Sequence, residues 1–230
     1  VMDLAARGWA KSVLNPMDSV VAGCQWAGRG QLGRRWISPP GNLFAAWLIP
    51  EPLEGFCAVS LLMGYAVWLA LREHGVEARL KWPNDVLIEH RKVAGILCEQ
   101  RDSMLVAGVG VNIASHPSMA ELRGDGATAA ISLAAYGHSI RPLCLWERIR
   151  DHARGLLDPR RRASLAEEIE PHLAFRGETV QIITSGETTL IGRLCGLDRT
   201  GALWVEQAGR RHCITSGTVE LIAPQEVISV

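Results

Sequence analysis

The 230-residue chain lacks an excess of charge of either sign. It contains 24 Lys and Arg residues against 24 Asp and Glu residues, so its formal net charge at pH 7 is +0. A balanced chain lacks the long-range field that draws basic proteins to nucleic acid or to anionic membrane surfaces. We therefore expect no nucleic-acid partner.

A long uninterrupted hydrophobic run is also missing. The most apolar stretch, residues 56–71, is interrupted by Ser60, Gly64 and Tyr65 and is shorter than the roughly 20 residues that span a bilayer. The first residues show no basic start leading into the apolar core of a secretory signal. We expect a buried helix in this stretch, no membrane partner and a cytoplasmic location.

Close pairs of metal-binding residues are absent. The six cysteines and seven histidines form no Cys-x-x-Cys, His-x-x-x-His or His-Glu-x-x-His pattern, which argues against a transition-metal site and for reduced thiols. No Gly-x-x-x-x-Gly-Lys-Ser/Thr pattern occurs either, so any nucleotide is held without a P-loop.

Short strands and amphipathic helices fill most of the chain. The periodicity of apolar residues predicts helices at 2–12, 53–74, 129–136, 142–156 and 164–173, with strands at 19–25, 43–49, 78–82, 86–89, 92–100 and 104–112. After residue 175 only short strands remain, at 179–184, 188–197, 203–207, 211–215 and 219–222, separated by Gly or Asp turns. The sequence predicts an α+β domain at 1–174, with a mixed β-sheet flanked by helices, and a small β-barrel at 175–230.

Residues 28–33, Gly-Arg-Gly-Gln-Leu-Gly, match a dinucleotide-binding pattern. That pattern must open a helix, but Pro39 and Pro40 follow shortly after an aromatic segment and exclude one. The backbone amides and the arginines at 29, 34 and 35 can instead surround a phosphate or carboxylate. A surface turn with solvated arginines is the alternative.

Three later segments carry further candidates. They are Lys-Trp-Pro-Asn-Asp at 81–85, Arg-Lys-Val-Ala-Gly-Ile at 91–96 and Gly-Val-Gly-Val-Asn at 108–112. The first two place lysines, an amide and a carboxylate on one predicted hairpin. Each has a plain structural alternative: a solvated hairpin face for the lysines, a turn cap for Asp85, and close strand packing for the glycines.

Taken together, the motifs Gly-Arg-Gly-x-x-Gly-Arg-x-Trp, Lys-Trp-Pro-Asn-Asp, Arg-Lys-x-Ala-Gly-Ile and Gly-x-Gly-x-Asn, in this order, resemble those of biotin protein ligases, and residues 175–230 resemble the SH3-like domain of that family. The resemblance implies a catalytic domain of the class II aminoacyl-tRNA-synthetase type. It also implies ATP and Mg²⁺ as cofactors, biotin as substrate, a biotin carboxyl carrier domain of a carboxylase as acceptor partner, and self-association as a possible homodimer. A biotin-binding protein without ligase activity and a lipoate or octanoate transferase are the alternatives.

The resemblance assigns roles to individual residues. It implies that the catalytic residues are Lys92, Arg29 and Asp85. The biotin-binding residues that it implies are Gln25, Gly28, Arg29, Gly30, Lys92, Gly95, Leu97, Gly108 and Gly110. The ATP-binding and adenylate-binding residues that it implies are Arg29, Gln31, Arg34, Trp36, Lys81, Asn84 and Asn112. The magnesium ligands that it implies are Asp85 and Asn112.

Two positions depart from the family pattern. Gln31 stands where these ligases often have arginine, and the chain begins Val1-Met2-Asp3, without the Ser/Thr-rich triplet ending in Asn that precedes the first helix in the family. The helix-turn-helix module of the relatives that also act as repressors is not seen ahead of this domain, so we expect no repressor activity. We expect residues 31–38 to act as a lid over the adenylate.

Overall fold

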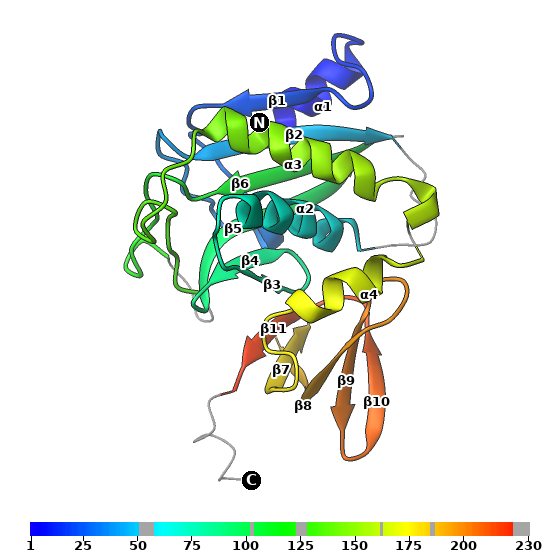
Figure 1. Ribbon diagram of the computed structural model, residues 1–230. Helices are drawn as coiled ribbons and strands as arrows, with labels where there is room; N and C mark the ends of the chain where they lie inside the picture. Colours follow the sequence, from blue (N-terminus) through cyan, green and yellow to red (C-terminus); the bar gives the residue numbers. More distant parts are fainter. Residues whose placement is uncertain (51–57, 102–103, 123–127, 162, 185–186, 223–230) are drawn as a thin grey trace.

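The computed structural model describes residues 1–50, 58–101, 104–122, 128–161, 163–184 and 187–222. Two antiparallel sheets follow one another along the chain, and helices cover the first of them (Figure 1). The α+β class with a small C-terminal sheet is therefore confirmed. In the described part of the chain, no helix is long and apolar enough to cross a membrane.

The first sheet has six strands in the order β1-β2-β6-β5-β4-β3. Its strands are β1 (Ser19–Ala22), β2 (Leu43–Pro50), β3 (Arg79–Lys81), β4 (Asp85–Ile88), β5 (Arg91–Arg101) and β6 (Met104–Val111). All its ladders are antiparallel, so the expected mixed sheet is wrong in this detail. Strands β3 to β6 succeed one another along the chain through short connections, and a short hairpin connection joins only antiparallel strands.

The two faces of this sheet are covered differently. Ala45, Trp47 and Ile49 belong to the main core, together with the buried residues of α2 (Val59–Glu73) and α3 (Pro142–Leu156). The alternate residues Ala46 and Leu48 instead pack against α1 (Met2–Ala10) in a separate cluster. Because successive side chains of a strand point to opposite faces, α1 lies on the face opposite α2 and α3.

Four expected helices differ from those observed. The first, expected at 2–12, ends at Ala10. Helix α2 begins at Val59, and the expected residues 53–57 lie outside the described part. The expected helix at 164–173 is divided into α4 (Leu165–Ile169) and the 3₁₀ turn η3 (Glu170–His172). The helix expected at 129–136 is wrong, because Lys92 N donates to Ala129 O at 2.7 Å and Ile131 N donates to Lys92 O at 3.0 Å. These bonds hold residues 129–131 extended, and residues 133–137 form turns, so tertiary pairing overrides the helical periodicity.

The C-terminal sheet has five strands in the order β10-β9-β8-β7-β11. They are β7 (Thr179–Thr184), β8 (Glu187–Leu197), β9 (Leu203–Gln207), β10 (Arg210–Ile214) and β11 (Thr218–Leu221). Its apolar side chains join the same core cluster as the first sheet. A hydrogen bond of 3.0 Å from Trp82 Nε1 to Gly201 O also connects the two parts. The proposed boundary between residues 174 and 175 stays a prediction.

Candidate functional site

A pocket of about 630 Å³ lies between the glycine loop, the first sheet and Thr218 of β11. It contains all but one of the residues that the sequence singled out. The lining includes Gln25, Arg29, Gly30, Gln31, Arg34, Trp36, Lys81, Asn84, Asp85, Lys92, Gly95, Leu97, Gly108, Gly110 and Asn112. The four separated motifs therefore meet at one place on the sheet.

Gly28 is the exception, because it does not line the pocket. A Cβ atom at this position would collide with Trp36 O and would lie 2.6 Å from Ser38 Oγ. Gly28 O accepts a hydrogen bond from Trp36 N at 2.9 Å, and Gly30 N donates to Arg34 O at 2.7 Å. The glycine at 28 thus allows the two arms of the loop to close on each other.

The tip of this loop is a single 3₁₀ turn, η1 (Gln31–Gly33), with Leu32 and Gly33 in the left-handed region at φ 55° and 71°. The chain then continues extended at Arg34, with φ −63° and ψ 141°. No long helix follows the glycines, which confirms that the dinucleotide pattern is misleading here. Gln31 and Leu32 of this turn line the pocket beside Gly30.

Glycines form the floor of the pocket. Gly95 of β5 is the direct partner of Gly110 of β6, and Leu97 is the partner of Gly108. The indole of Trp36 lies on this floor, since a Cβ on Gly110 would be 2.7 Å from Trp36 Cε2 and a Cβ on Gly95 would be 2.8 Å from Trp36 Cζ3. Small residues are therefore required here for close approach of a flat group.

Lys92 and Asp85 form an ion pair at the edge of this floor. Lys92 Nζ lies 2.6 Å from Asp85 Oδ1, and the two side chains are 24% and 13% exposed. The same ammonium lies 5.1 Å from the Trp36 ring centroid, within the range of a cation–π contact. A cation, a carboxylate and an aromatic ring thus meet in a partly dehydrated position.

Lys81 of β3, the cross-strand partner of Asp85 in β4, provides a second cation. Its Nζ donates to Thr128 Oγ1 at 2.8 Å, and only 7% of the residue is exposed. Burial lowers the pKa of Lys81 below that of an ordinary lysine, although Asp85 raises it in part. A buried ammonium that donates to a neutral hydroxyl gains strongly from an anionic ligand.

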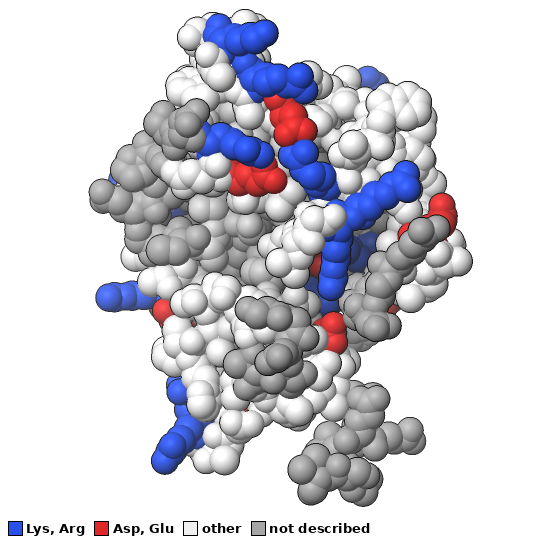
Figure 2. Space-filling model, turned by 180° about the vertical axis from the view of Figure 1, so that it is seen from behind, with Lys and Arg blue, Asp and Glu red and all other residues white. Residues whose placement is uncertain are grey.

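The arginines of the loop are placed differently from one another. Arg29 donates two hydrogen bonds to Asp3 of α1 rather than to any group near Lys92. In the described part of the chain, Arg34 and Arg35 have no carboxylate within ion-pair distance. Figure 2 shows Lys and Arg side chains gathered with a few carboxylates on the face opposite α2 and α3.

Two asparagines face the same pocket. Asn84 Nδ2 donates to Ile96 O at 2.8 Å, and Asn112 Nδ2 donates to Ile131 O at 3.2 Å. Both side chains are thereby oriented through their nitrogen atoms, which leaves the amide oxygens as possible ligands. Within the described ranges, no group of three or more His, Cys, Asp or Glu residues could hold a metal. The oxygen of Asn112 and the carboxylate of Asp85 suit a magnesium ion that takes most of its ligands from phosphates and water.

Some pocket residues escaped the sequence reasoning. Asp3, Thr128 and Thr218 line the pocket, yet none belongs to a recognisable motif. Asp3 lies 26 positions from its partner Arg29, and Thr218 comes from the other sheet. No local pattern signals such contacts, because they depend on how distant elements pack.

Comparison with known proteins agrees with this geometry. Residues 2–114 match the model of the biotin/lipoate A/B protein ligase family. The chain is 34% identical over 216 residues to a biotin–[acetyl-CoA-carboxylase] ligase of Paracoccus denitrificans, covering 87% of this chain and 88% of that protein.

Two further relatives extend the comparison. The bifunctional ligase/repressor BirA of Escherichia coli is 31% identical over 208 residues, which cover 84% of this chain and 62% of BirA. A solved biotin protein ligase from Aquifex aeolicus, in complex with biotin and ATP, superposes with a TM-score of 0.80 at 26% identity, covering 91% of this chain and 90% of that one. The chain belongs to the biotin protein ligase family.

Proposed function

We propose that this protein activates biotin with ATP to form biotinyl-5′-adenylate and then transfers the biotinyl group to a lysine of a biotin carboxyl carrier domain. Its membership of the family supports the reaction. The observation that carries the proposal is the Lys92–Asp85 pair at the edge of the Gly95–Gly110 floor. Once the Trp36 indole moves off it, this flat floor beside a partly buried cation suits a ligand with an apolar body and a carboxylate end.

In the first step, a carboxylate oxygen of biotin attacks the α-phosphorus of ATP, and the bond to the β-phosphate breaks to release pyrophosphate. Two anions must approach each other, so positioned cations and amides lower the barrier. We assign Lys92 to the reacting carboxylate and α-phosphate. Lys81 and Arg34 then neutralise the remaining phosphate charge, and Gly30, with Gln31 beside it, lines the edge of the loop.

Magnesium would neutralise further phosphate charge during this step. We propose that Asp85 and the oxygen of Asn112 hold it, with Asn84 close by in the same pocket. These are the hard oxygen ligands that the ion prefers. The residues of this chain orient the phosphates around it.

Retention of the adenylate protects it from water before transfer. The anhydride is easily hydrolysed, so a loop that covers it is needed. We propose that residues 31–38 form this cover and that the Trp36 indole shields the ligand. Gln25 stabilises the base of the loop, since its Nε2 donates to Ser38 Oγ at 3.0 Å.

In the second step, a neutral lysine amine of the carrier domain attacks the carbonyl carbon, and AMP leaves. The attacking nitrogen must lose a proton, and a carboxylate nearby can accept or orient it. Asp85 is the carboxylate at the edge of the floor, and we propose it for this role. The acceptor lysine then enters from the open side of the pocket.

The direct test incubates purified protein with ATP, Mg²⁺ and an equal mixture of biotin, lipoate and octanoate, and identifies the acyl-adenylates by mass spectrometry. The proposal predicts biotinyl-5′-AMP as the main product. Lipoyl-AMP or octanoyl-AMP as the main product would instead make the chain a ligase for another acid. Biotin binding in calorimetry without any adenylate would make it a binding protein.

A further inference from the structure

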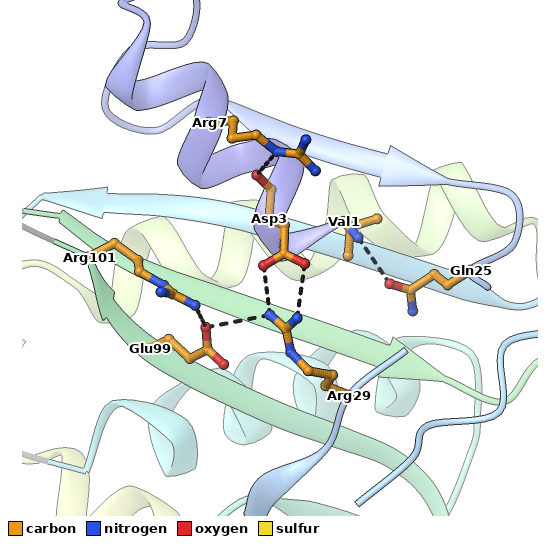
Figure 3. Close-up of polar contacts among 7 residues, drawn as sticks. All are labelled: Val1, Asp3, Arg7, Gln25, Arg29, Glu99 and Arg101. Carbon is orange, nitrogen blue, oxygen red and sulfur yellow. Dashed lines mark hydrogen bonds and ion pairs between the residues drawn. The ribbon is translucent and has the colours of Figure 1, made fainter. Parts of the chain in front are cut away.

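A pair between Arg29 and Asp3 joins the glycine loop to the first helix. Arg29 Nη2 lies 2.7 Å from Asp3 Oδ1, and Arg29 Nη1 lies 2.9 Å from Asp3 Oδ2 (Figure 3). Two parallel hydrogen bonds between a guanidinium and a carboxylate fix direction as well as distance. Arg29 is therefore held toward α1.

A second carboxylate completes the charge balance around Arg29. Glu99 of β5 places Oε2 3.9 Å from Arg29 Nη2, and Arg101 Nη2 approaches the same oxygen at 2.6 Å (Figure 3). Two positive and two negative side chains thus form a neutral group. The hydrogen bonds from Arg29 lower the pKa of Asp3, and those to Asp3 raise the pKa of Arg29. The Arg29 guanidinium is therefore engaged by Asp3, with Glu99 nearby. The Val1 ammonium adds a further positive charge beside this group.

Helix α1 is anchored in the sheet, whereas the tip of the glycine loop is exposed. Ala5, two residues after Asp3, is fully buried in a cluster with Leu48 and Met104 of the sheet. At the tip of the loop, Leu32 is 85% exposed, and Arg34 is exposed as well. The ion pair of Arg29 with Asp3 of α1 thus lies just before the exposed tip of the loop.

We propose that Asp3 is a positioning residue for the glycine loop. The Arg29 side chain attaches the loop to Asp3 and does not act as a cation on the phosphates. Asp3 acts through Arg29 to hold the amides near Gly30 at the rim of the pocket. This inference rests on the proposed function of that pocket. It leaves the charge at the reacting phosphate to Lys92, Lys81 and Arg34.

The test compares Asp3→Ala, Arg29→Ala and the double variant with the wild type. The control is Asp151→Ala, which removes a carboxylate of similar exposure, 55% against 52%, that pairs with Arg148 at 3.5 Å. Each single variant should raise the KM for biotin and shorten the half-life of the purified biotinyl-adenylate complex by about three- to fivefold. The double variant should be no worse than either single one, with kcat within about twofold throughout.

Two variants separate positioning from a general structural effect. Asp3→Glu keeps the charge and should recover most of the KM. The exchange of the pair, Asp3→Arg with Arg29→Asp, should recover more activity than either single change. If Arg29→Ala instead lowers kcat by about 100-fold or more while Asp3→Ala does not, Arg29 is a catalytic cation and the inference is wrong.

Trypsin gives a readout that needs no ligand. Arg34 and Arg35 are exposed, and cleavage after them becomes faster as the loop becomes more mobile, so it should be several-fold faster in Asp3→Ala and unchanged in Asp151→Ala. Equal rates in Asp3→Ala and the wild type would overturn the inference. If the wild type made no adenylate but the variant was cleaved faster, the proposed function would fail while the tie between Asp3 and Arg29 would stand.

Discussion

Lys92 Nζ lies 2.6 Å from Asp85 Oδ1, on the neighbouring strands β5 and β4. The pair stands at the edge of the glycine floor, beside the side of the pocket that we assign to the phosphates. It joins the two steps of the proposed reaction, because Lys92 serves the first and Asp85 serves both. The predictions below test this arrangement and the fold that holds it.

Asp85→Asn keeps the shape of the side chain but removes its charge. We expect adenylate formation to fall by about 100-fold and to need a higher concentration of Mg²⁺, because an amide binds the ion more weakly than a carboxylate. Magnesium titration of the initial rate measures both effects. Glu89→Gln, in the turn of the same hairpin and paired with Arg91, is the control. An unchanged magnesium requirement in Asp85→Asn would remove Asp85 from the metal site.

Gly110→Ala tests the floor of the pocket. The new methyl group would lie 2.7 Å from Trp36 Cε2, so the indole must move from its place. We expect the KM for biotin to rise about tenfold, a loss of about 1.4 kcal/mol in binding. Gly23→Ala is the control, because no atom lies within 4 Å of a Cβ at that position. Equal KM values for the two variants would show that the ligand does not use this floor.

Glu73 tests the attachment of α3 to α2. Its carboxylate accepts hydrogen bonds from Arg148 Nη2 at 2.7 Å and from Arg148 Nε at 2.8 Å. These bonds, with a smaller contribution from His152, lower the pKa of Glu73 from 4.5 to about 2. Because the folded pKa lies below the unfolded one, the stabilisation is complete above pH 4.5 and is lost as the pH falls toward 2.

Glu73→Gln should therefore lower the free energy of unfolding at pH 7, but by only about 1 kcal/mol or less, since the pair is exposed to solvent. Urea unfolding from pH 7 down to pH 3 measures it, and the gap to the wild type should narrow as the pH falls. Glu147→Gln, an exposed glutamate of α3, should show no such gap. A constant difference across this range would contradict the assignment.

Asp198 stabilises the turn between β8 and β9 that contacts Trp82. Its Oδ1 accepts from Thr200 N at 2.8 Å, Thr200 Oγ1 at 2.7 Å and Ala202 N at 2.8 Å. Asp198→Ala leaves these donors without their acceptor and should cost about 1–3 kcal/mol in the free energy of unfolding. Chemical denaturation, with Arg199→Ala as the neutral neighbour, checks it. A loss equal to that of Arg199→Ala would contradict the role of the turn.

Local patterns allowed much of the fold to be predicted. The alternation of apolar residues located β7 and β9 with their observed bounds and placed α3 at its observed bounds. The motifs at 81–85, 91–96 and 108–112 marked the strands that line the pocket. Such signals are local, so they can be read before the chain is folded.

Contacts between distant segments were not predictable in this way. The pairing of Lys92 with residues 129–131 removed an expected helix. The hydrogen bonds to Asp3 direct the side chain of Arg29, a predicted catalytic residue, toward α1. The position of Trp36 on two glycines became visible only in the folded chain. Each depends on packing rather than on any pattern within a short window.

Biotin-dependent exchange of radiolabelled pyrophosphate into ATP tests the central claim most directly, because it reports the first step without the carrier domain. The wild type should catalyse exchange that requires both biotin and Mg²⁺. Lys92→Met, which keeps the length of the side chain but not its charge, should lower it by about 100-fold or more, whereas Gly23→Ala should match the wild type. Absence of biotin-dependent exchange in the wild type, or full exchange in Lys92→Met, would contradict the account.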